Sequence, residues 1–354
     1  MTSAPLPSKE NTGGPRRRVR MRDVATRCDV SISTVSLVLS GDPRIPEDTA
    51  RRVLQAVKAM EYRPSVIARS LARRYSRTIG VILPEFAFHR NQPFYYQALQ
   101  GIHSQTQPAG YKMVVEAANK VFIERRYHLR LLKEQSADGV IFMAASLNDL
   151  FLTEMEKEPY PFAMLGATAD GVNLLSAQGD DFAGAQMAVN HLISLGHKKI
   201  GHLSGMATIS FGRERERGYR QSMKEAGLNV EPAWVISGEL DSVQAENAAL
   251  KLVEAGVTAI FAGADVMAYG ALRALKKAGR RVPEDMAVIG MDDLDMSACI
   301  TPSLSTVRYD IAQMASQAAH FVIKQIHNPT IQKTLLGEMP KPRLIIRETC
   351  GGKA

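Results

Sequence analysis

The chain has 354 residues, of which 45% are hydrophobic and 23% charged, and no window approaches the ~18 consecutive apolar residues of a membrane helix. A fully disordered chain and a membrane-spanning protein are thereby excluded. Three scattered cysteines (Cys28, Cys299 and Cys350) fit neither a disulfide framework nor a C-x-x-C metal motif, and residues 1–20 lack the apolar core of a secretory signal. We therefore expect a cytoplasmic protein that holds no metal or cofactor.

The net charge of +8 is unevenly distributed along the chain. Residues 1–77 contain 16 Lys and Arg against 7 Asp and Glu, whereas residues 78–354 contain 28 against 29. This asymmetry indicates a small basic module carried by a nearly neutral body. A polyanion is its natural partner, because each neutralised phosphate releases counterions. A solvated basic tail that binds nothing specific is the alternative.

The first predicted segments are a disordered basic arm over residues 1–20 and three short helices over residues 21–63. In the arm, three prolines and two glycines accompany few apolar side chains. From Met21 onward, apolar residues recur at spacings of three and four, with breaks at 28–31 and 40–43. Two short helices joined by a tight turn are typical of a helix-turn-helix, with Ser31 capping the second helix and Val35 packing inward. A plain three-helix bundle has the same spacing.

The second helix is the predicted recognition helix. Its outer face (Ile32, Ser33, Ser36 and Leu37) is expected to enter the major groove of DNA, where such helices contact base edges.

After Thr78 the pattern changes to short apolar runs that alternate with amphipathic helical segments. This alternation predicts an α/β fold built from parallel strands with helices on both faces of each sheet. About 275 residues is large for one such sheet, so two similar lobes with a cleft between them are expected. The predicted strands are 79–83, 113–115, 140–143, 163–165, 200–203, 259–262, 287–291 and 344–346, and the predicted helices are 95–107, 122–134, 183–195, 216–226, 243–254 and 266–278.

The chain resembles the LacI/GalR family of bacterial transcription repressors. Its N-terminal module contains D-V-A-x-x-x-x-V-S-x-x-T-V-S-x-V-L from Asp23, followed by 62–65, 68–71 and 78–81. The body contains further segments that match the family in order and spacing, at 196–201, 215–219, 265–270, 282–293 and 301–307. The resemblance covers residues 20–349.

The resemblance implies a homodimer that binds a pseudo-palindromic operator and whose periplasmic-binding-protein-like core, residues 78–354, senses a small molecule. Residues 64–77 are expected to form a hinge helix and linker, in which Leu71 enters the minor groove; an exposed leucine between arginines suits a wedge between base steps. A buried linker leucine is the alternative. The lobes are expected at 78–179 plus 308–330 and at 180–307 plus 331–349. The expected DNA-contacting residues are Arg22, Ser31, Ile32, Ser33, Thr34, Ser36, Leu37, Arg44, Ser65, Ala68, Arg69 and Leu71.

Three departures from the family pattern leave the operator sequence open. Leu37 stands where many relatives have Arg or His, and leucine offers only apolar contact to a base. Asp29 follows Cys28 where Ala-Gly is usual, but aspartate tolerates the left-handed conformation of the turn. Ser65 replaces a commoner asparagine.

Candidate effector-binding residues follow the predicted strands, because parallel α/β lobes bind ligands at the carboxyl ends of their strands. A carboxylate and a guanidinium facing an aromatic ring suit a polyhydroxylated ring, so a sugar or sugar derivative is expected, with a nucleobase or another metabolite as the alternative. By resemblance, Arg215 and Asp292 are the recurrent effector contacts. The expected effector-binding residues are Phe94, Tyr95, Asp181, Arg215, Asp265 and Asp292.

Five of these six residues have a structural alternative. Asp265 opens a predicted helix and could simply cap it, and Phe94 and Tyr95 could belong to the core. Arg215 and Asp292 each lie among like charges that could be solvated. The stretch 86–93, longer than is usual in the family, could cover the cleft or only decorate the surface.

An enzyme and a free solute-binding protein are the alternative classes of function. The chain has no G-x-S-x-G, no G-x-x-x-x-G-K-[ST], no H-E-x-x-H and no G-x-G-x-x-G motif, so no catalytic residue is expected. A solute-binding protein would need an export signal and would not need the basic helices. No heptads follow Arg347, so no tetramerising tail is expected.

Overall fold

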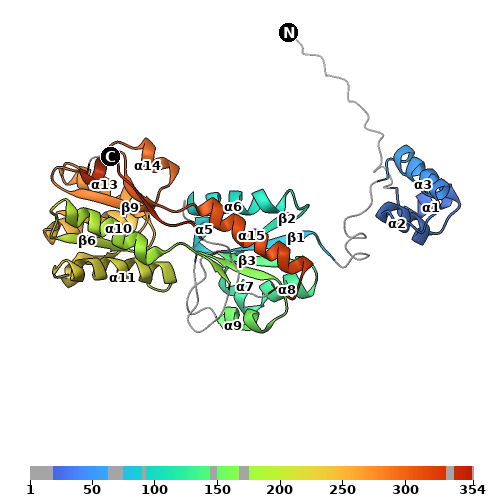
Figure 1. The fold of residues 1–354 in the computed structure, drawn as a ribbon, viewed down its shortest axis with the longest axis horizontal. Helices are drawn as coiled ribbons and strands as arrows, with labels where there is room; N and C mark the ends of the chain where they lie inside the picture. Colours follow the sequence, from blue (N-terminus) through green and yellow to red (C-terminus); the bar gives the residue numbers. More distant parts are fainter. Residues whose placement is uncertain are drawn as a thin grey trace, which may run out of the picture. The chain divides into compact units, whose positions relative to one another are not determined.

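The computed structural model describes residues 19–62, 75–89, 93–143, 150–166, 175–331 and 339–352. The chain divides into two compact units, residues 1–74 and 75–354 (Figure 1).

The first unit contains three helices, α1 (Met21–Cys28), α2 (Ile32–Ser40) and α3 (Glu47–Ala59). Between α1 and α2 the chain turns at Asp29, whose φ of 50° is left-handed, as the sequence predicted. The Ser31 hydroxyl accepts a hydrogen bond from the backbone N–H of Thr34 at 3.0 Å and caps α2. A small core, made of Val24, Ala25, Cys28, Val35, Val38, Val53, Ala56 and Tyr62, holds the helices together. The predicted helix-turn-helix is confirmed.

The second unit contains two α/β lobes, each with its own sheet (Figure 1). The sheet of the first lobe has the order β2-β1-β3-β4-β5, and all of its pairings are parallel, with Ile79 of β1 opposite Met113 on one side and Gly139 on the other. Its strands are β1 (Thr78–Pro84), β2 (Lys112–Ala118), β3 (Gly139–Met143), β4 (Phe162–Leu165) and β5 (Ser176–Ala177).

The sheet of the second lobe has the order β11-β10-β9-β8-β6-β7. Its strands are β6 (Ile200–Ser204), β7 (Val235–Ser237), β8 (Ala259–Ala262), β9 (Ala287–Asp292), β10 (Ser305–Arg308) and β11 (Arg343–Ile345). One edge strand departs from the predicted parallel pattern, because β11 pairs antiparallel with β10.

Helices cover the sheets of both lobes, and two of the predicted helices differ from those in the structure. The helix predicted over 122–134 is interrupted at Arg126, whose φ of 51° separates α7 (Lys120–Glu124) from α8 (Tyr127–Lys133). The helix predicted from Glu216 begins six residues earlier, so Arg215 lies inside α11. The other helices are α5 (Phe86–His89), α6 (Pro93–Thr106), α9 (Leu150–Lys157), α10 (Asp181–Ser194), α11 (Ser210–Glu225), α12 (Ser242–Glu254), α13 (Asp265–Lys277), α14 (Asp295–Cys299) and α15 (Ile311–His327), with short 3-10 turns at Pro232–Trp234 and Glu348–Cys350.

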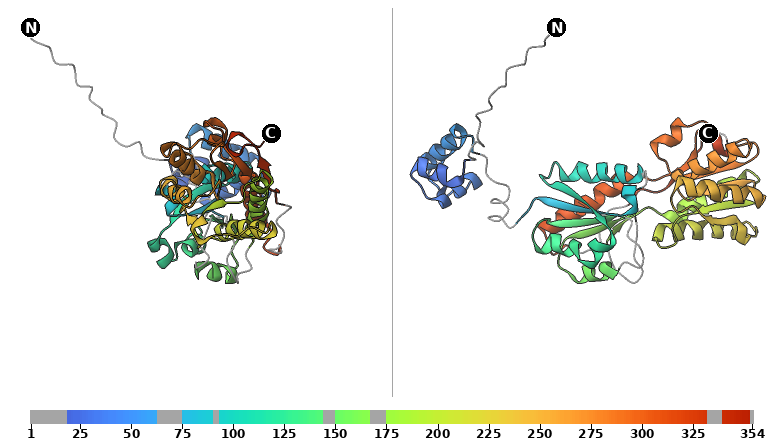
Figure 2. Two further views of the ribbon diagram at one scale, coloured as in Figure 1. Left: turned by 90° about the vertical axis from the view of Figure 1, so that its left-hand side faces the viewer. Right: turned by 180° about the vertical axis from the view of Figure 1, so that it is seen from behind.

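The chain passes between the lobes more than once. After β5 it enters the second lobe at Gly179 and Asp180, and after β10 it returns through Tyr309 and Asp310 to α15, which packs against α6 and β4 of the first lobe. Figure 2 shows this late, orange-red helix among the cyan and green elements of the first lobe. The carboxyl ends of strands from both sheets therefore come close to the crossings, where a ligand site is expected.

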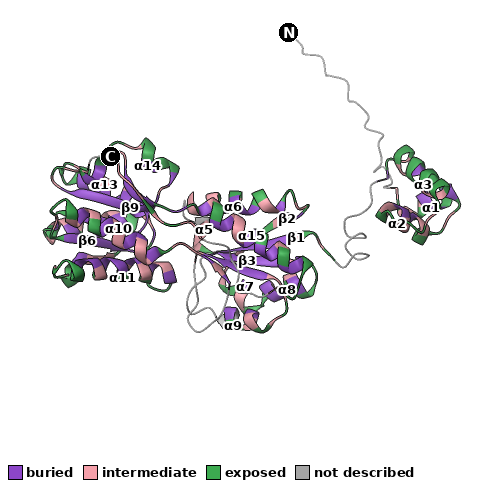
Figure 3. Cartoon of the chain, viewed as in Figure 1, coloured by how far each residue is buried: buried purple, intermediate pink, exposed green. Residues whose placement is uncertain are grey.

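Most strands lie in the interior and the helices present an exposed face, as the purple strands and green outer helix surfaces of Figure 3 show, whereas the edge strands β2, β7 and β11 contain no buried residue. The strands β3, β4, β6, β8 and β9 are buried along their whole length. Near-continuous apolar runs of this kind are typical of parallel sheets covered on both faces. Among the described helices, none has the length and apolar character needed to cross a membrane.

Candidate functional site

The exposed face of α2 carries the predicted recognition residues. Val35 and Val38 point into the core of the first unit, whereas Ile32 is 53% exposed although it is apolar. Helical periodicity places the polar and small side chains of this face beside Ile32. Ser31, Ile32 and Ser33 are exposed, and Thr34, Ser36 and Leu37 are half-buried. The serine hydroxyls of this surface can form hydrogen bonds with base edges, and Ile32 can make apolar contacts.

The two arginines predicted to contact phosphates are both exposed but are not equally available. Arg22 lies 3.8 Å from Asp23 and keeps half of its side chain exposed. Arg44 instead donates two hydrogen bonds to Asp42, from Nε at 3.0 Å and from Nη2 at 2.7 Å. These hydrogen bonds lower the pKa of Asp42 to about 2. Any phosphate that binds Arg44 therefore competes with a carboxylate.

The predicted arm and hinge lie outside the described residues. This applies to residues 1–18 and to the hinge residues Ser65, Ala68, Arg69 and Leu71, whose expected roles remain predictions. Part of the 86–93 stretch is described: it starts with α5, and the Phe86 ring contacts the Tyr95 ring edge-on at 6.3 Å.

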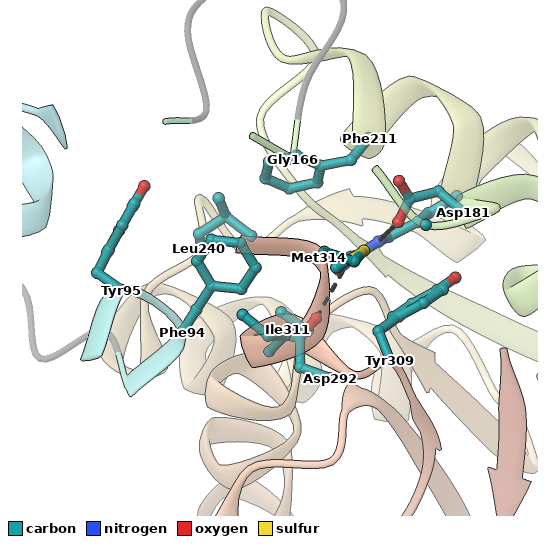
Figure 4. A pocket seen from close by; sticks show the side chains of 13 residues that line it. Phe94, Tyr95, Gly166, Asp181, Phe211, Leu240, Asp292, Tyr309, Ile311 and Met314 are labelled. Carbon is teal, nitrogen blue, oxygen red and sulfur yellow. Dashed lines mark hydrogen bonds and ion pairs between the residues drawn. The ribbon is translucent and has the colours of Figure 1, made fainter. Parts of the chain in front are cut away.

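A cavity opens between the lobes of the second unit and encloses about 590 Å³ of empty space, its mouth to solvent included. We call it the interlobe cavity. Side chains of both lobes and of the two described crossings surround it (Figure 4). Its lining residues are Phe94, Tyr95, Gly166, Gly179, Asp181, Phe211, Arg215, Leu240, Ala264, Asp292, Tyr309, Ile311 and Met314.

A buried guanidinium forms the polar centre of the cavity. Arg215 donates from Nε to Asp181 Oδ1 at 2.8 Å and from Nη1 to the backbone oxygen of Gly263 at 2.5 Å. Its Nη2 lies 3.3 Å from Asp292 Oδ1. The guanidinium carbon also lies 4.9 Å from the centre of the Phe211 ring. Thus three polar residues predicted from the sequence as effector contacts form one cluster.

Three separate elements bring these side chains together. Asp181 is the first residue of α10, while the preceding Asp180 caps that helix by accepting from the N–H of Ala183. Arg215 lies in the second turn of α11. Asp292 ends β9 with a φ of 116°, which non-glycine residues rarely adopt. Strained backbone of this kind is concentrated at functional sites.

Burial changes the protonation behaviour of the cluster. It raises the pKa of Asp181 and, with the nearby Asp181 charge, raises the pKa of Asp292 to about 6, although Arg215 acts in the opposite direction. Burial by itself would lower the pKa of Arg215, but the two carboxylates outweigh it and raise that pKa. Arg215 therefore stays charged.

Aromatic and aliphatic groups of the first lobe face this cluster. Phe94 and Tyr95 begin α6, and their rings meet at a right angle with centres 5.4 Å apart. Both line the cavity, as Figure 4 shows, whereas the adjacent Tyr96 is 66% exposed. Tyr95 is also almost wholly buried, so it serves the core and the cavity at once.

Asp265 is the predicted effector residue that the structure does not place among those lining the cavity. It is fully buried, and Oδ1 accepts from Thr306 Oγ1 at 2.6 Å. Its Oδ2 accepts from the Leu294 N–H at 2.9 Å and from Ser297 Oγ at 2.5 Å. Both oxygens are thus used to hold the segment after Asp292. Asp265 positions this loop, its side chain does not cap α13, and its expected role as an effector contact remains a prediction.

Most of the apolar residues that line the interlobe cavity, and one polar residue, Tyr309, were not predicted from the sequence. Tyr309 directly follows β10, a strand that was not predicted, so the rule about strand ends could have found it. The other lining residues that were missed are Gly166, Gly179, Phe211, Leu240, Ala264, Ile311 and Met314. These are ordinary core residue types, and no sequence signal separates them from the core.

Comparison with protein families gives two matches. Residues 20–65 match the bacterial regulatory proteins of the lacI family, and residues 189–350 match a periplasmic binding protein-like domain. Among curated proteins, the HTH-type transcriptional repressor PurR of Photobacterium profundum is 30% identical over 332 residues, which cover 93% of this chain and 98% of that protein. The ribose operon repressor of Halalkalibacterium halodurans is 30% identical over 338 residues, covering 94% and 97%.

Two solved structures are similar to this chain over most of its length. A complex of the transcriptional regulator CelR with cellobiose is similar with a TM-score of 0.71 and 26% identity, covering 94% of this chain and all of that one. The lac repressor dimer bound to operator and the anti-inducer ONPF is similar in fold, with a TM-score of 0.81 and 24% identity over 94% of this chain and 99% of that one.

Proposed function

Since this chain belongs to the lacI family of bacterial regulatory proteins, it is a DNA-binding transcriptional regulator and not an enzyme, and we propose that a sugar-like molecule in the interlobe cavity controls its affinity for operator DNA. The observation that carries this proposal is the Arg215 cluster facing the aromatic rings of Phe94 and Tyr95. Carboxylates and a guanidinium form charge-assisted hydrogen bonds to hydroxyls, while ring faces pack on C–H groups.

The names of two relatives are consistent with a sugar as the effector. One similar protein is named a ribose operon repressor, and one similar structure contains cellobiose. A neutral ring with several hydroxyls also suits a cavity that offers carboxylate acceptors and apolar walls.

We propose that the regulator works in the cytoplasm as a homodimer that places two copies of α2 in successive major grooves. A dimer on operator is the state of the similar lac repressor structure. Dimeric helix-turn-helix proteins bind half-sites one helical turn apart, which explains a pseudo-palindromic operator. An effector changes operator affinity only by its difference in affinity between the DNA-competent and DNA-incompetent states. The cavity offers such a difference, because its two walls belong to different lobes.

Binding to DNA is tested with the full chain and with a chain that begins at Thr78. Selection from a randomised duplex library should yield a pseudo-palindrome for the full chain, with binding that weakens steeply as salt increases. The shortened chain should bind no duplex. Operator binding by the shortened chain would contradict the assignment of DNA contacts to residues 19–74.

The effector site is tested by thermal shift with a panel of sugars and nucleobases, followed by calorimetry. A ligand that binds only the folded state raises its apparent stability. Arg215→Gln should abolish the response to the hit, whereas Arg220→Ala, an exposed arginine on the same helix paired with Glu216, should preserve it. Unchanged affinity of Arg215→Gln would place the effector elsewhere, and a response only to nucleobases would replace the sugar.

A further inference from the structure

The charges of the ionisable groups that line the interlobe cavity do not sum to zero. Arg215 is the one cation among the described lining residues, and Asp181 and Asp292 are two carboxylates, so the ionised cluster has a net charge of −1. Side chains of all three are at least nine-tenths buried, so water screens the charges poorly. The excess negative charge is therefore felt by any ligand that enters.

Both features of the cavity that attract anions are already occupied by protein carboxylates. Three of the five N–H groups of Arg215 already face protein oxygens, from Nε to Asp181, from Nη1 to the Gly263 carbonyl and from Nη2 to Asp292. The N-terminus of α10, whose partial positive charge favours anions, carries Asp181 in its first turn and is capped by Asp180. A phosphate or carboxylate ligand would have to share Arg215 with Asp181 and Asp292 and stay beside their charges in a buried space.

We propose that Asp181 is a specificity-determining residue that closes the cavity to anionic ligands. The effector is then a neutral or cationic molecule that donates hydrogen bonds, and not a phosphorylated or carboxylated one. This inference rests on the proposed function of the cavity as the effector site. It assigns the two carboxylates different roles: Asp292 accepts from the ligand, and Asp181 sets the charge that the ligand must match.

The apolar walls of the cavity also disfavour anionic ligands. Leu240, Ile311 and Met314 line the cavity and donate no hydrogen bond to an anion. An anion that lost its hydration there would have to share the Arg215 guanidinium with two protein carboxylates. Desolvating a charge without a partner is costly.

Inorganic sulfate is the probe, because it is small and stays dianionic over the working pH range. Thermal shift and calorimetry compare sodium sulfate with sodium chloride at equal ionic strength for the wild type, Asp181→Asn and Asp181→Asn/Asp292→Asn. We expect no cavity binding in the wild type, binding in Asp181→Asn, and affinity about tenfold or more higher in the double variant. Binding to the variants should disappear when Arg215→Gln is added.

Matched variants keep the outcome interpretable. Asp285→Asn removes one carboxylate from an exposed pair with Arg281 in the same lobe, and should gain no sulfate binding. Circular dichroism and thermal melting test whether each variant folds. If Asp181→Asn does not fold, Asp181→Ser replaces it, because serine also suits the start of a helix.

Two results would overturn the inference: sulfate binding to the wild type that Arg215→Gln removes, or a folded Asp181 variant that gains none. Either result leaves the cavity intact as an effector site. Failure of the proposed effector site would look different. A metabolite that binds the wild type and Arg215→Gln with equal affinity would contradict that site, but it would not change the sulfate measurements.

Discussion

The hydroxyl of Tyr309 donates a hydrogen bond to the backbone oxygen of Asp180 at 2.9 Å, and this bond joins the two described crossings between the lobes. The ring reaches that position because Gly184 and Gly179 have no side chains: a Cβ on Gly184 would lie 2.1 Å from the Tyr309 oxygen, and one on Gly179 2.4 Å from its ring. Tyr309 also lines the interlobe cavity. One residue thus lines the cavity and also joins the two described segments that connect the lobes.

Tyr309→Phe should lower the free energy of unfolding by about 1–2 kcal/mol, because the carbonyl of Asp180 loses a buried donor. It should also change the response to effector, since the crossings are no longer joined. Urea denaturation and effector titration measure the two effects. Tyr96→Phe, at an exposed ring of the same residue type, is the control and should change neither. Equal stability of Tyr309→Phe and the wild type would show that the bond does not hold the crossings.

Ser31→Ala should destabilise the first unit by about 1 kcal/mol, because the N–H of Thr34 loses its cap. Hydrogen exchange of α1–α3 amides in the full chain measures the loss, and affinity for all duplexes should fall with it. Ser33→Ala is the matched variant on the same exposed turn. It should leave exchange unchanged and alter base preference at one or two operator positions, so identical selected operators would argue against a role in reading bases.

Asp42→Asn should raise DNA affinity severalfold and make its salt dependence steeper, because it releases Arg44 for a phosphate and removes a negative charge. Fluorescence anisotropy with a duplex at several salt concentrations measures both. Asp48→Asn provides the comparison, since Asp48 forms a similar exposed pair with Arg51 on α3. Equal gains in the two variants would mean that Arg44 has no special place on the DNA-binding surface.

Acid should destabilise the second lobe through His202, whose ring stacks between those of Tyr219 and Phe261 with centres 5.1 and 4.9 Å away. Burial lowers the pKa of His202 from 6.5 to about 4. The unfolded chain therefore binds the proton more tightly, and stability present above pH 6.5 is lost as the pH falls towards 4.

His202→Phe keeps an aromatic ring and removes the titration, so its stability should decline less over this range, by on the order of a few kcal/mol. Denaturation at pH 7 and pH 5 gives the difference. His103→Phe, at an exposed position, should follow the wild type. A parallel decline of the His202 variant and the wild type would assign the acid sensitivity to other groups.

Local patterns were enough to predict the two-unit organisation and most elements. Helical spacing in residues 21–61 and apolar runs after Thr78 depend on neighbours a few residues apart, so they are visible in the chain itself. The resemblance and the strand-end rule together located Arg215, Asp181 and Asp292, because the carboxyl ends of parallel strands meet at one edge.

Only the tertiary structure decided how those residues interact. Asp181 and Arg215 are 34 positions apart, and nothing in their spacing shows that one occupies the other's guanidinium. Asp265 comes three residues after β8 and Asp292 ends β9, so both lie near strand ends, but the Asp265 carboxylate is directed towards Leu294 and Ser297. Residue type and strand position determine which side chains can reach a cleft. Their partners depend on the packing of segments distant in sequence, and this is why Asp265 holds a loop while Asp181 and Asp292 face the cavity.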